Sequence, residues 1–85
     1  SADERVAAFL VMLRDHQIEH GGSAQDLALS MSRADIASYL RLAAETVSRV
    51  MQRFQRHGLI QVMRRDVKLL DPGRLDALAQ AVLPN

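Results

Sequence analysis

Two helical patterns separated by only a few residues, between Ser32 and Gly58, constrain the fold more than any other feature of the sequence. In the second pattern, apolar residues recur at i, i+3, i+4 and i+7, which predicts a helix with one buried face. These residues are Val47, Val50, Met51 and Phe54. Two helices joined by so tight a turn must cross steeply, with small or apolar residues where they touch. The sequence therefore predicts a helix-turn-helix over about residues 32–57.

The first of these helices is predicted from its start signal and its buried face. Ser32 is a suitable N-cap, and Asp35 three residues later forms a capping box with Asp in place of Glu. Ile36, Ala37 and Leu40 form the apolar face of about two turns. The second helix should end near Gly58, since glycine is favoured just after a helix.

The segments on both sides complete the fold. A first helix is expected from about Asp3 to about His20, ended by Gly21-Gly22, and the alternating "DLALS" predicts a short edge strand. After Gly58 the apolar period changes from 3.6 to 2, so "LIQVM" and "VKLLD" predict a β-hairpin over about residues 59–70. Pro72 begins a last helix, whose predicted apolar stripe consists of Leu75, Leu78, Ala79 and Val82.

The predicted fold class is mainly α with a small β-hairpin. The order is helix, short strand, helix-turn-helix, hairpin wing and C-terminal helix, which is a winged helix-turn-helix. All 85 residues form one domain in this interpretation, a size at which a single core is marginal but sufficient. The abrupt start at Ser1 suggests a domain from a longer chain.

The amino-acid composition excludes some kinds of site and favours one kind of partner. Cysteine is absent, which excludes disulfides and thiolate metal sites and suits a reducing cytoplasm. No apolar run reaches the roughly 18 residues of a membrane span. The net charge is only +1, yet residues 33–68 hold eight Arg or Lys against three Asp or Glu. A concentration of arginine suits contacts with phosphates and bases, so nucleic acid is the expected partner.

The polar face of the second motif helix carries the candidate binding chemistry. Glu45, Ser48 and Arg49 lie at i, i+3 and i+4 and leave the helix together, near the end that enters the major groove in such motifs. Arginine can pair with guanine O6 and N7, glutamate can accept from cytosine N4, and serine can serve several base edges. The alternative is a solvated face on which Glu45 and Arg49 pair with each other.

One rival motif lies in the first helix. "HQIEH", from His16 to His20, matches the inverted zinc-peptidase pattern H-x-x-E-H. Zinc hydrolysis also needs a third protein ligand and a substrate cleft, and this short chain offers no architecture for a cleft. The expectation is therefore that the protein is not an enzyme, and that the domain holds no metal and no cofactor.

The stretch "MSRADIASYLRLAAETVSRVMQRFQRHGLI" resembles the DNA-binding domain of the Crp/Fnr transcription regulators. The element "ETVSR" is similar to the Fnr-type signature E-x-x-S-R, and Ala44 with Ser48 favours the Fnr/FixK branch. The resemblance covers about residues 27–70 closely. It implies that Glu45, Ser48 and Arg49 bind the bases of a TTGAT-like half-site of a palindrome.

The resemblance also implies DNA contacts by residues other than Glu45, Ser48 and Arg49. The sequence departs from the family pattern at two positions in the turn. The implied backbone contacts are Ser32, Arg33 and Thr46, and Ala44 and Gln52 are candidate groove contacts beside them. Arg64, Arg65 and Lys68 of the wing are further candidates for phosphate contacts, with a solvated hairpin tip as the alternative. The family often has Gly-Leu-Thr in the turn, where this chain has Arg41-Leu42-Ala43. Either a left-handed backbone at Arg41 or a slightly different turn is therefore expected, and the N-cap oxygen is lost at Ala43.

For the whole regulator, the resemblance implies a sensor domain, a homodimer and contacts with RNA polymerase. The fragment alone is expected to be a monomer with weak affinity for double-stranded DNA. The effector, the regulated genes, the operator sequence and the choice between activation and repression cannot be deduced from these residues. The alternative from another class is a winged helix that binds proteins and has no specific DNA target.

Overall fold

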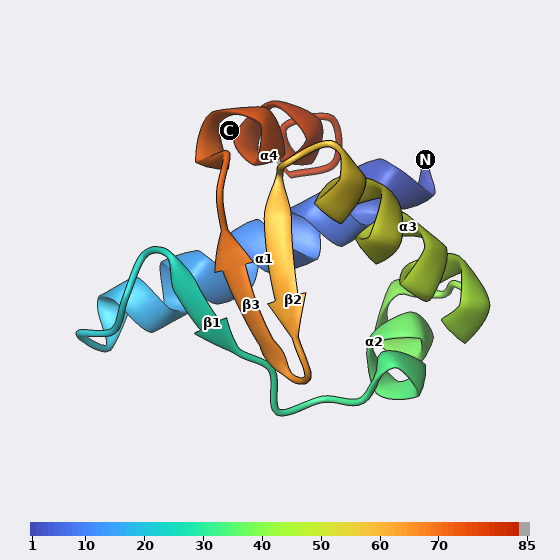
Figure 1. The fold of residues 1–85 in the computed structure, drawn as a ribbon, viewed down its shortest axis with the longest axis horizontal. Helices are drawn as coiled ribbons and strands as arrows, with labels where there is room; N and C mark the ends of the chain where they lie inside the picture. Colours follow the sequence, from blue (N-terminus) through green and yellow to red (C-terminus); the bar gives the residue numbers. More distant parts are fainter. Residues whose placement is uncertain (84–85) are drawn as a thin grey trace.

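The computed structural model describes residues 1–83 and contains four helices and three strands within them (Figure 1). The elements in chain order are α1 (Ala2–Glu19), β1 (Asp26–Ala28), α2 (Arg33–Leu40), α3 (Ala44–Arg56), β2 (Ile60–Met63), β3 (Asp66–Leu69) and α4 (Pro72–Ala79). This is the winged helix-turn-helix order expected from the sequence. No helix among the described residues is long and apolar enough to cross a membrane.

The three strands form one antiparallel sheet in the order β1-β3-β2. β1 is therefore an edge strand, as predicted, and it pairs Leu27 with Val67 of β3. β2 and β3 pair Met63 with Asp66, which leaves a two-residue turn. In Figure 1 the sheet lies in front of α1, with α4 across one end and α2 and α3 to one side. The hairpin tip thus lies toward the start of α2.

The long helix α1 is buried more completely than the sequence predicted. The helical spacing of Val6, Phe9, Leu10 and Leu13 predicts one buried stripe. The first three are buried and Leu13 is partly buried, but Ala7, Ala8 and Val11 are buried as well. A helix that is apolar around its whole circumference is enclosed on several sides. Here α1 packs against α3, α4 and β1, so one stripe could not describe it.

The C-terminal end of α4 differs from the prediction. The helix ends at Ala79, and Val82 lies beyond it with 47% of its surface exposed. Leu75 and Ala79 are buried, whereas Leu78 is only partly covered. The predicted stripe was therefore right for the first two turns and wrong at Val82.

The caps of the two motif helices match the sequence in part. The Asp35 N–H donates to Ser32 Oγ at 3.1 Å, so Ser32 is the N-cap of α2. Within residues 1–83, no bond runs back from the Asp35 carboxylate to the Ser32 N–H, so only half of the capping box forms. Aspartate is one methylene shorter than the usual glutamate, which accounts for the missing half. Ala43 precedes α3 with no side-chain cap, as expected.

The turn between the motif helices places Arg41 in the left-handed region, with φ 59° and ψ 44°. The left-handed backbone, one of the two expectations for this turn, is thus confirmed. A side chain with a Cβ destabilises this conformation, whereas glycine adopts it readily.

Replacing Arg41 with glycine is therefore expected to raise the free energy of unfolding by about 1 kcal/mol. Urea denaturation followed by circular dichroism measures the change. Arg41→Ala is the matched control, because it removes the same charge and keeps the Cβ. Equal stability of the glycine and alanine variants would show that the left-handed backbone costs nothing here.

Candidate nucleic-acid interface

The first two turns of α3 present the predicted base-reading residues at the surface. The side chains of Glu45 and Arg49 are 74% and 68% exposed, and Ser48 between them is half-buried. The opposite face of the same helix is buried, since Val47 and Val50 are at most 1% exposed. The core therefore fixes which face of α3 is turned outward, and the three polar residues lie together on that face.

Glu45 and Arg49 form an ion pair in the free protein, with 2.6 Å between Arg49 Nη2 and Glu45 Oε1. An exposed pair at i, i+4 stabilises a helix by only about 0.3–0.5 kcal/mol. Breaking it therefore costs little, so both groups remain available for other partners. This is the pairing that the alternative of a solvated face predicts for Glu45 and Arg49.

The start of α3 also offers backbone donors. Val47 N–H bonds to the Ala43 carbonyl, but Ala43 provides no side-chain acceptor for the first N–H groups of the helix. Free N–H groups at a helix start attract anions such as phosphate. Thr46 is half-buried at this end and Ala44 is exposed, so the missing cap leaves the helix start accessible.

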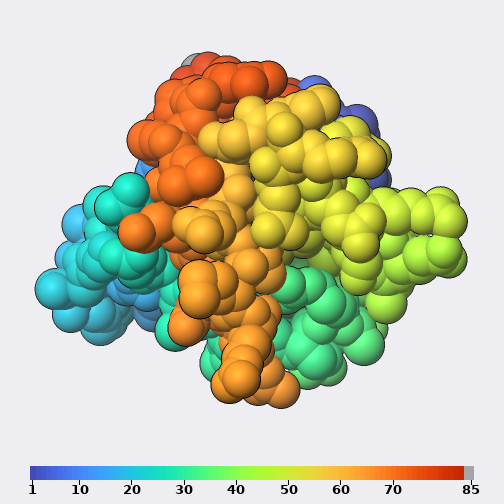
Figure 2. All heavy atoms as spheres, viewed as in Figure 1, coloured from blue at the N-terminus to red at the C-terminus, as the bar shows by residue number. Residues whose placement is uncertain are grey.

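Two further elements lie beside this helix start. Figure 2 shows the beginning of α3 as one projection and the β2–β3 turn as another, with the start of α2 between them. Arg33 is half-buried in the first turn of α2, and Arg64 and Arg65 are exposed in the hairpin turn. Within residues 1–83, no carboxylate lies in salt-bridge range of these three arginines.

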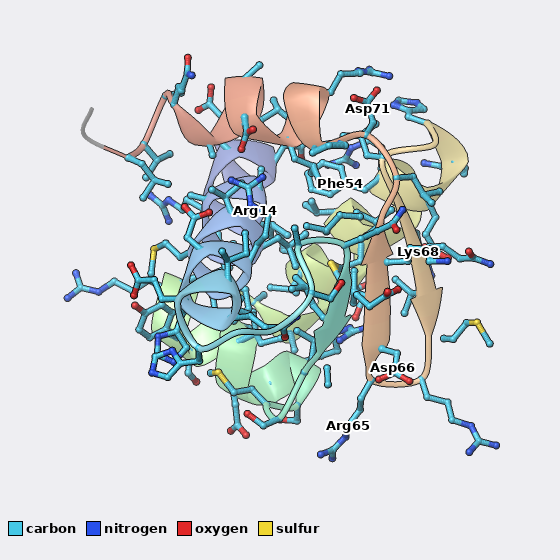
Figure 3. All side chains as sticks on the ribbon, turned by 90° about the vertical axis from the view of Figure 1, so that its left-hand side faces the viewer. Arg14, Phe54, Arg65, Asp66, Lys68 and Asp71 are labelled. Atoms are coloured by element: carbon cyan, nitrogen blue, oxygen red, sulfur yellow. The ribbon has the colours of Figure 1, made fainter. Side chains whose placement is uncertain are left out.

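Ser32 and Lys68 occupy different settings from the other predicted contacts. The Ser32 oxygen accepts the Asp35 N–H as a cap, so its own hydroxyl hydrogen is the group left for a phosphate. Lys68 is not at the hairpin turn: it lies inside β3, opposite Asp26 on one side and Gln61 on the other. Lys68 follows Asp66 by two residues in β3, and Figure 3 shows it further from the hairpin turn than Arg65 and Asp66.

Gln52 continues the exposed face of α3 by one turn. It lines a shallow open hollow together with Gln55 and Arg56. The Gln55 Oε1 atom accepts the Val62 N–H of the edge strand β2 at 3.1 Å, so its side chain has a structural role. Gln52 and Arg56 make no such bond among the described residues.

Arg53 of α3 is half-buried, and its guanidinium is paired with a carboxylate of α1. Its Nε donates to Asp3 Oδ2 at 3.2 Å, and its Nη2 donates to Asp3 Oδ1. Hydrogen bonding to Asp3 and the attraction of its charge raise the pKa of Arg53 above the ordinary value. Nothing in the sequence predicted this partner, because the two residues are 50 positions apart.

The histidines of "HQIEH" lie at the exposed end of α1. The ring centroids of His16 and His20 are 4.4 Å apart, and His20 Nδ1 is 2.8 Å from the His16 carbonyl. No group of three or more His, Cys, Asp or Glu residues within the described part of the chain could hold a metal ion. The third ligand that zinc chemistry requires is therefore not supplied by these residues.

Comparison with known proteins gives consistent matches. A family model described as a Crp-like helix-turn-helix domain matches residues 4–78. The nitrogen fixation regulation protein FixK of Bradyrhizobium diazoefficiens is 48% identical over 81 residues, which is 95% of this chain and 34% of FixK. The transcriptional activator protein Anr of Pseudomonas aeruginosa is 52% identical over 79 residues, covering 93% of this chain and 32% of Anr.

The solved structures agree with the sequence matches. The structure of FixK2 from Bradyrhizobium japonicum superimposes with a TM-score of 0.84 and 36% identity, covering 98% of this chain and 40% of that chain. The chain thus spans about a third of the length of the curated relatives it matches. These relatives are named as regulators or activators, which agrees with the expectation that the chain is not an enzyme.

Proposed function

Because the chain belongs to the Crp/Fnr family of transcription regulators, as a Crp-like helix-turn-helix domain, we propose that α3 recognises one half-site of a palindromic DNA operator. The observation that carries the proposal is the exposure of Glu45, Ser48 and Arg49 together at the start of a helix whose other face is buried. Such a helix enters the major groove with its N-terminal residues at the base edges.

The proposed half-site is TTGAT-like. It contains a single G·C pair, and this pair presents both preferred partners, guanine O6 and N7 for Arg49 and cytosine N4 for Glu45. The ion pair between these two side chains suits that arrangement, since both would then address one base pair. Ser48 lies beside them and serves a neighbouring base.

The surrounding residues are proposed to bind the sugar–phosphate backbone. Five residues flank the face of α3 that carries Glu45, Ser48 and Arg49. They are Ser32 and Arg33 at the start of α2, Thr46 near the start of α3, and Arg64 with Arg65 at the hairpin turn. Lys68 is part of the same proposal, although its place in the sheet gives it the weakest geometric support. Gln52 and Ala44 would line the groove wall.

The whole regulator is proposed to be longer than this chain, because the relatives are regulators about three times as long. From its membership of the family, it is also proposed to be a cytoplasmic homodimer that contacts RNA polymerase. The 85-residue chain alone would then hold one half-site as a monomer. Its affinity should be weak, since it lacks the second set of contacts.

Binding of fluorescent duplexes, measured by anisotropy over a range of salt concentrations, tests the proposed function. The chain should prefer a duplex with TTGAT…ATCAA to one with scrambled half-sites. A protein-binding winged helix would show no preference at any salt concentration. Equal binding of both duplexes by an artificially dimerised form would therefore favour that alternative.

Replacing Arg33 with alanine is expected to weaken binding to both duplexes equally. The slope of log K against log salt concentration should fall by about 0.9 for each phosphate that the variant no longer binds. Arg33→Lys is the control, because a retained charge should retain most of the slope. A change in the ratio between the two duplexes would instead place Arg33 at a base edge.

A further inference from the structure

Two charged side chains in the first turns of α1 contact both helices of the helix-turn-helix motif. The Asp3 carboxylate accepts two bonds from the Arg53 guanidinium of α3. Arg5 Nη1 donates to the Leu40 carbonyl, at the last residue of α2, at 3.4 Å. Figure 1 shows the start of α1 beside the second half of α3. The beginning of α1 is thus a common support for α2 and α3.

The bond between Arg53 and Asp3 has the fork geometry that gives orientation as well as attraction. Each carboxylate oxygen accepts from a different guanidinium nitrogen, so two contacts join the groups in place of one. The side chains are 39% and 33% exposed, which leaves the pair partly shielded from water. A lysine could not reproduce this geometry, because its ammonium is a point charge.

Arg53 lies on α3 close to the residues proposed to bind bases, which are Glu45, Ser48 and Arg49. Arg53 follows Arg49 by four residues, so the two side chains are neighbours along the helix surface. Rotation of α3 about its axis would move Arg53 away from Asp3 and would turn Glu45, Ser48 and Arg49 by the same angle. The buried contacts of α3 fix which face is turned outward, and the fork adds one directional contact at the edge of that face.

We propose that the Asp3–Arg53 pair is a positioning element that adjusts the rotation of α3 within the limits set by the core, and that Arg53 is engaged by Asp3 and makes no phosphate contact. The proposal rests on the proposed function, since the positioning matters for the reading of DNA. The proposal distinguishes Arg53 from Arg56, which lies three residues further along α3 and is exposed.

The experiment compares Asp3→Asn, Arg53→Gln, their combination and the conservative Asp3→Glu, with Arg56→Gln as the matched control. The unfused 85-residue chain is used at low salt, with a half-site duplex and a scrambled one. Urea denaturation establishes that each variant is folded. Residual dipolar couplings report the orientation of α3 relative to α1 without DNA.

Arg53→Gln is expected to lower the preference for the half-site about threefold or more, with the salt slope unchanged. Asp3→Asn frees the Arg53 charge, so it should strengthen binding to the scrambled duplex and raise the salt slope by about 1. Asp3→Glu should restore much of the preference. The residual dipolar couplings of α3 should change in Arg53→Gln and in Asp3→Asn, and they should remain unchanged in Arg56→Gln.

Two results would overturn the positioning role. One is a salt slope that falls by about 0.9 in Arg53→Gln, as expected when a phosphate is no longer bound. The other is an unchanged orientation of α3 in both Asp3→Asn and Arg53→Gln. If the unmodified chain shows no duplex preference, the proposed function fails, and the dipolar couplings still decide whether the pair positions α3.

Discussion

Replacing Phe54 with alanine is expected to lower the free energy of unfolding by about 3–5 kcal/mol. Phe54 lies in α3 with 2% of its surface exposed, and it belongs to the single core shared by the helices and the sheet. In Figure 3 it lies in the interior, away from the hairpin turn. A domain of this size has about 5–15 kcal/mol of total stability, so the variant should be near its unfolding threshold.

Urea denaturation followed by circular dichroism measures this loss. Gln52→Ala is the control on the same helix, because Gln52 is exposed and its replacement should change stability by less than about 0.5 kcal/mol. Phe54→Leu should fall between the two, since it keeps part of the buried volume. A loss below about 1 kcal/mol in Phe54→Ala would mean that α3 is not anchored through this residue.

Replacing Arg49 with alanine is expected to remove about 1–3 kcal/mol of discrimination for the half-site, which is the value of a good bidentate base contact. Arg49 is exposed beside Glu45 on the outward face of α3, and only a weak ion pair must break before it binds guanine. Competition between specific and scrambled duplexes measures the change. Affinity for the scrambled duplex should fall much less.

The control for charge is Arg49→Lys, which keeps the cation and loses the fork. It should retain most of the salt slope while losing most of the discrimination. A matched change in the DNA sharpens the experiment: replacing the G·C pair of TTGAT should weaken binding by the unmodified chain more than binding by Arg49→Ala, because only the proposed contact of Glu45 with cytosine is left for that variant to lose. Equal losses by Arg49→Ala on every duplex would identify a phosphate contact.

Much of the fold could be predicted because its signals are local. The apolar spacing of α3, the N-cap at Ser32 and the change of period after Gly58 each depend on residues close in sequence. The left-handed residue Arg41 could also be expected, because the turn is short and the related proteins often have glycine there. Membership of the Crp/Fnr family, expected from "ETVSR", is confirmed by the comparisons.

The features that could not be predicted are those that depend on packing between distant segments. The enclosure of α1 on several sides follows from its contacts with α3, α4 and β1, which no single stripe encodes. The partner of Arg53 lies 50 residues away, at the start of α1. The strand that contains Lys68 was predicted, but its cross-strand neighbours Asp26 and Gln61 depend on the strand register, which the sequence did not predict.

Selection from a pool of random duplexes tests most directly whether α3 recognises a TTGAT-like half-site. An artificially dimerised form of the chain is incubated with the pool at moderate salt, and bound duplexes are amplified and sequenced over several rounds. Enrichment of two TTGAT-like half-sites in inverted orientation is the predicted result, and it should be lost in Arg49→Ala. Recovery of duplexes with no shared sequence would contradict base recognition by Glu45, Ser48 and Arg49.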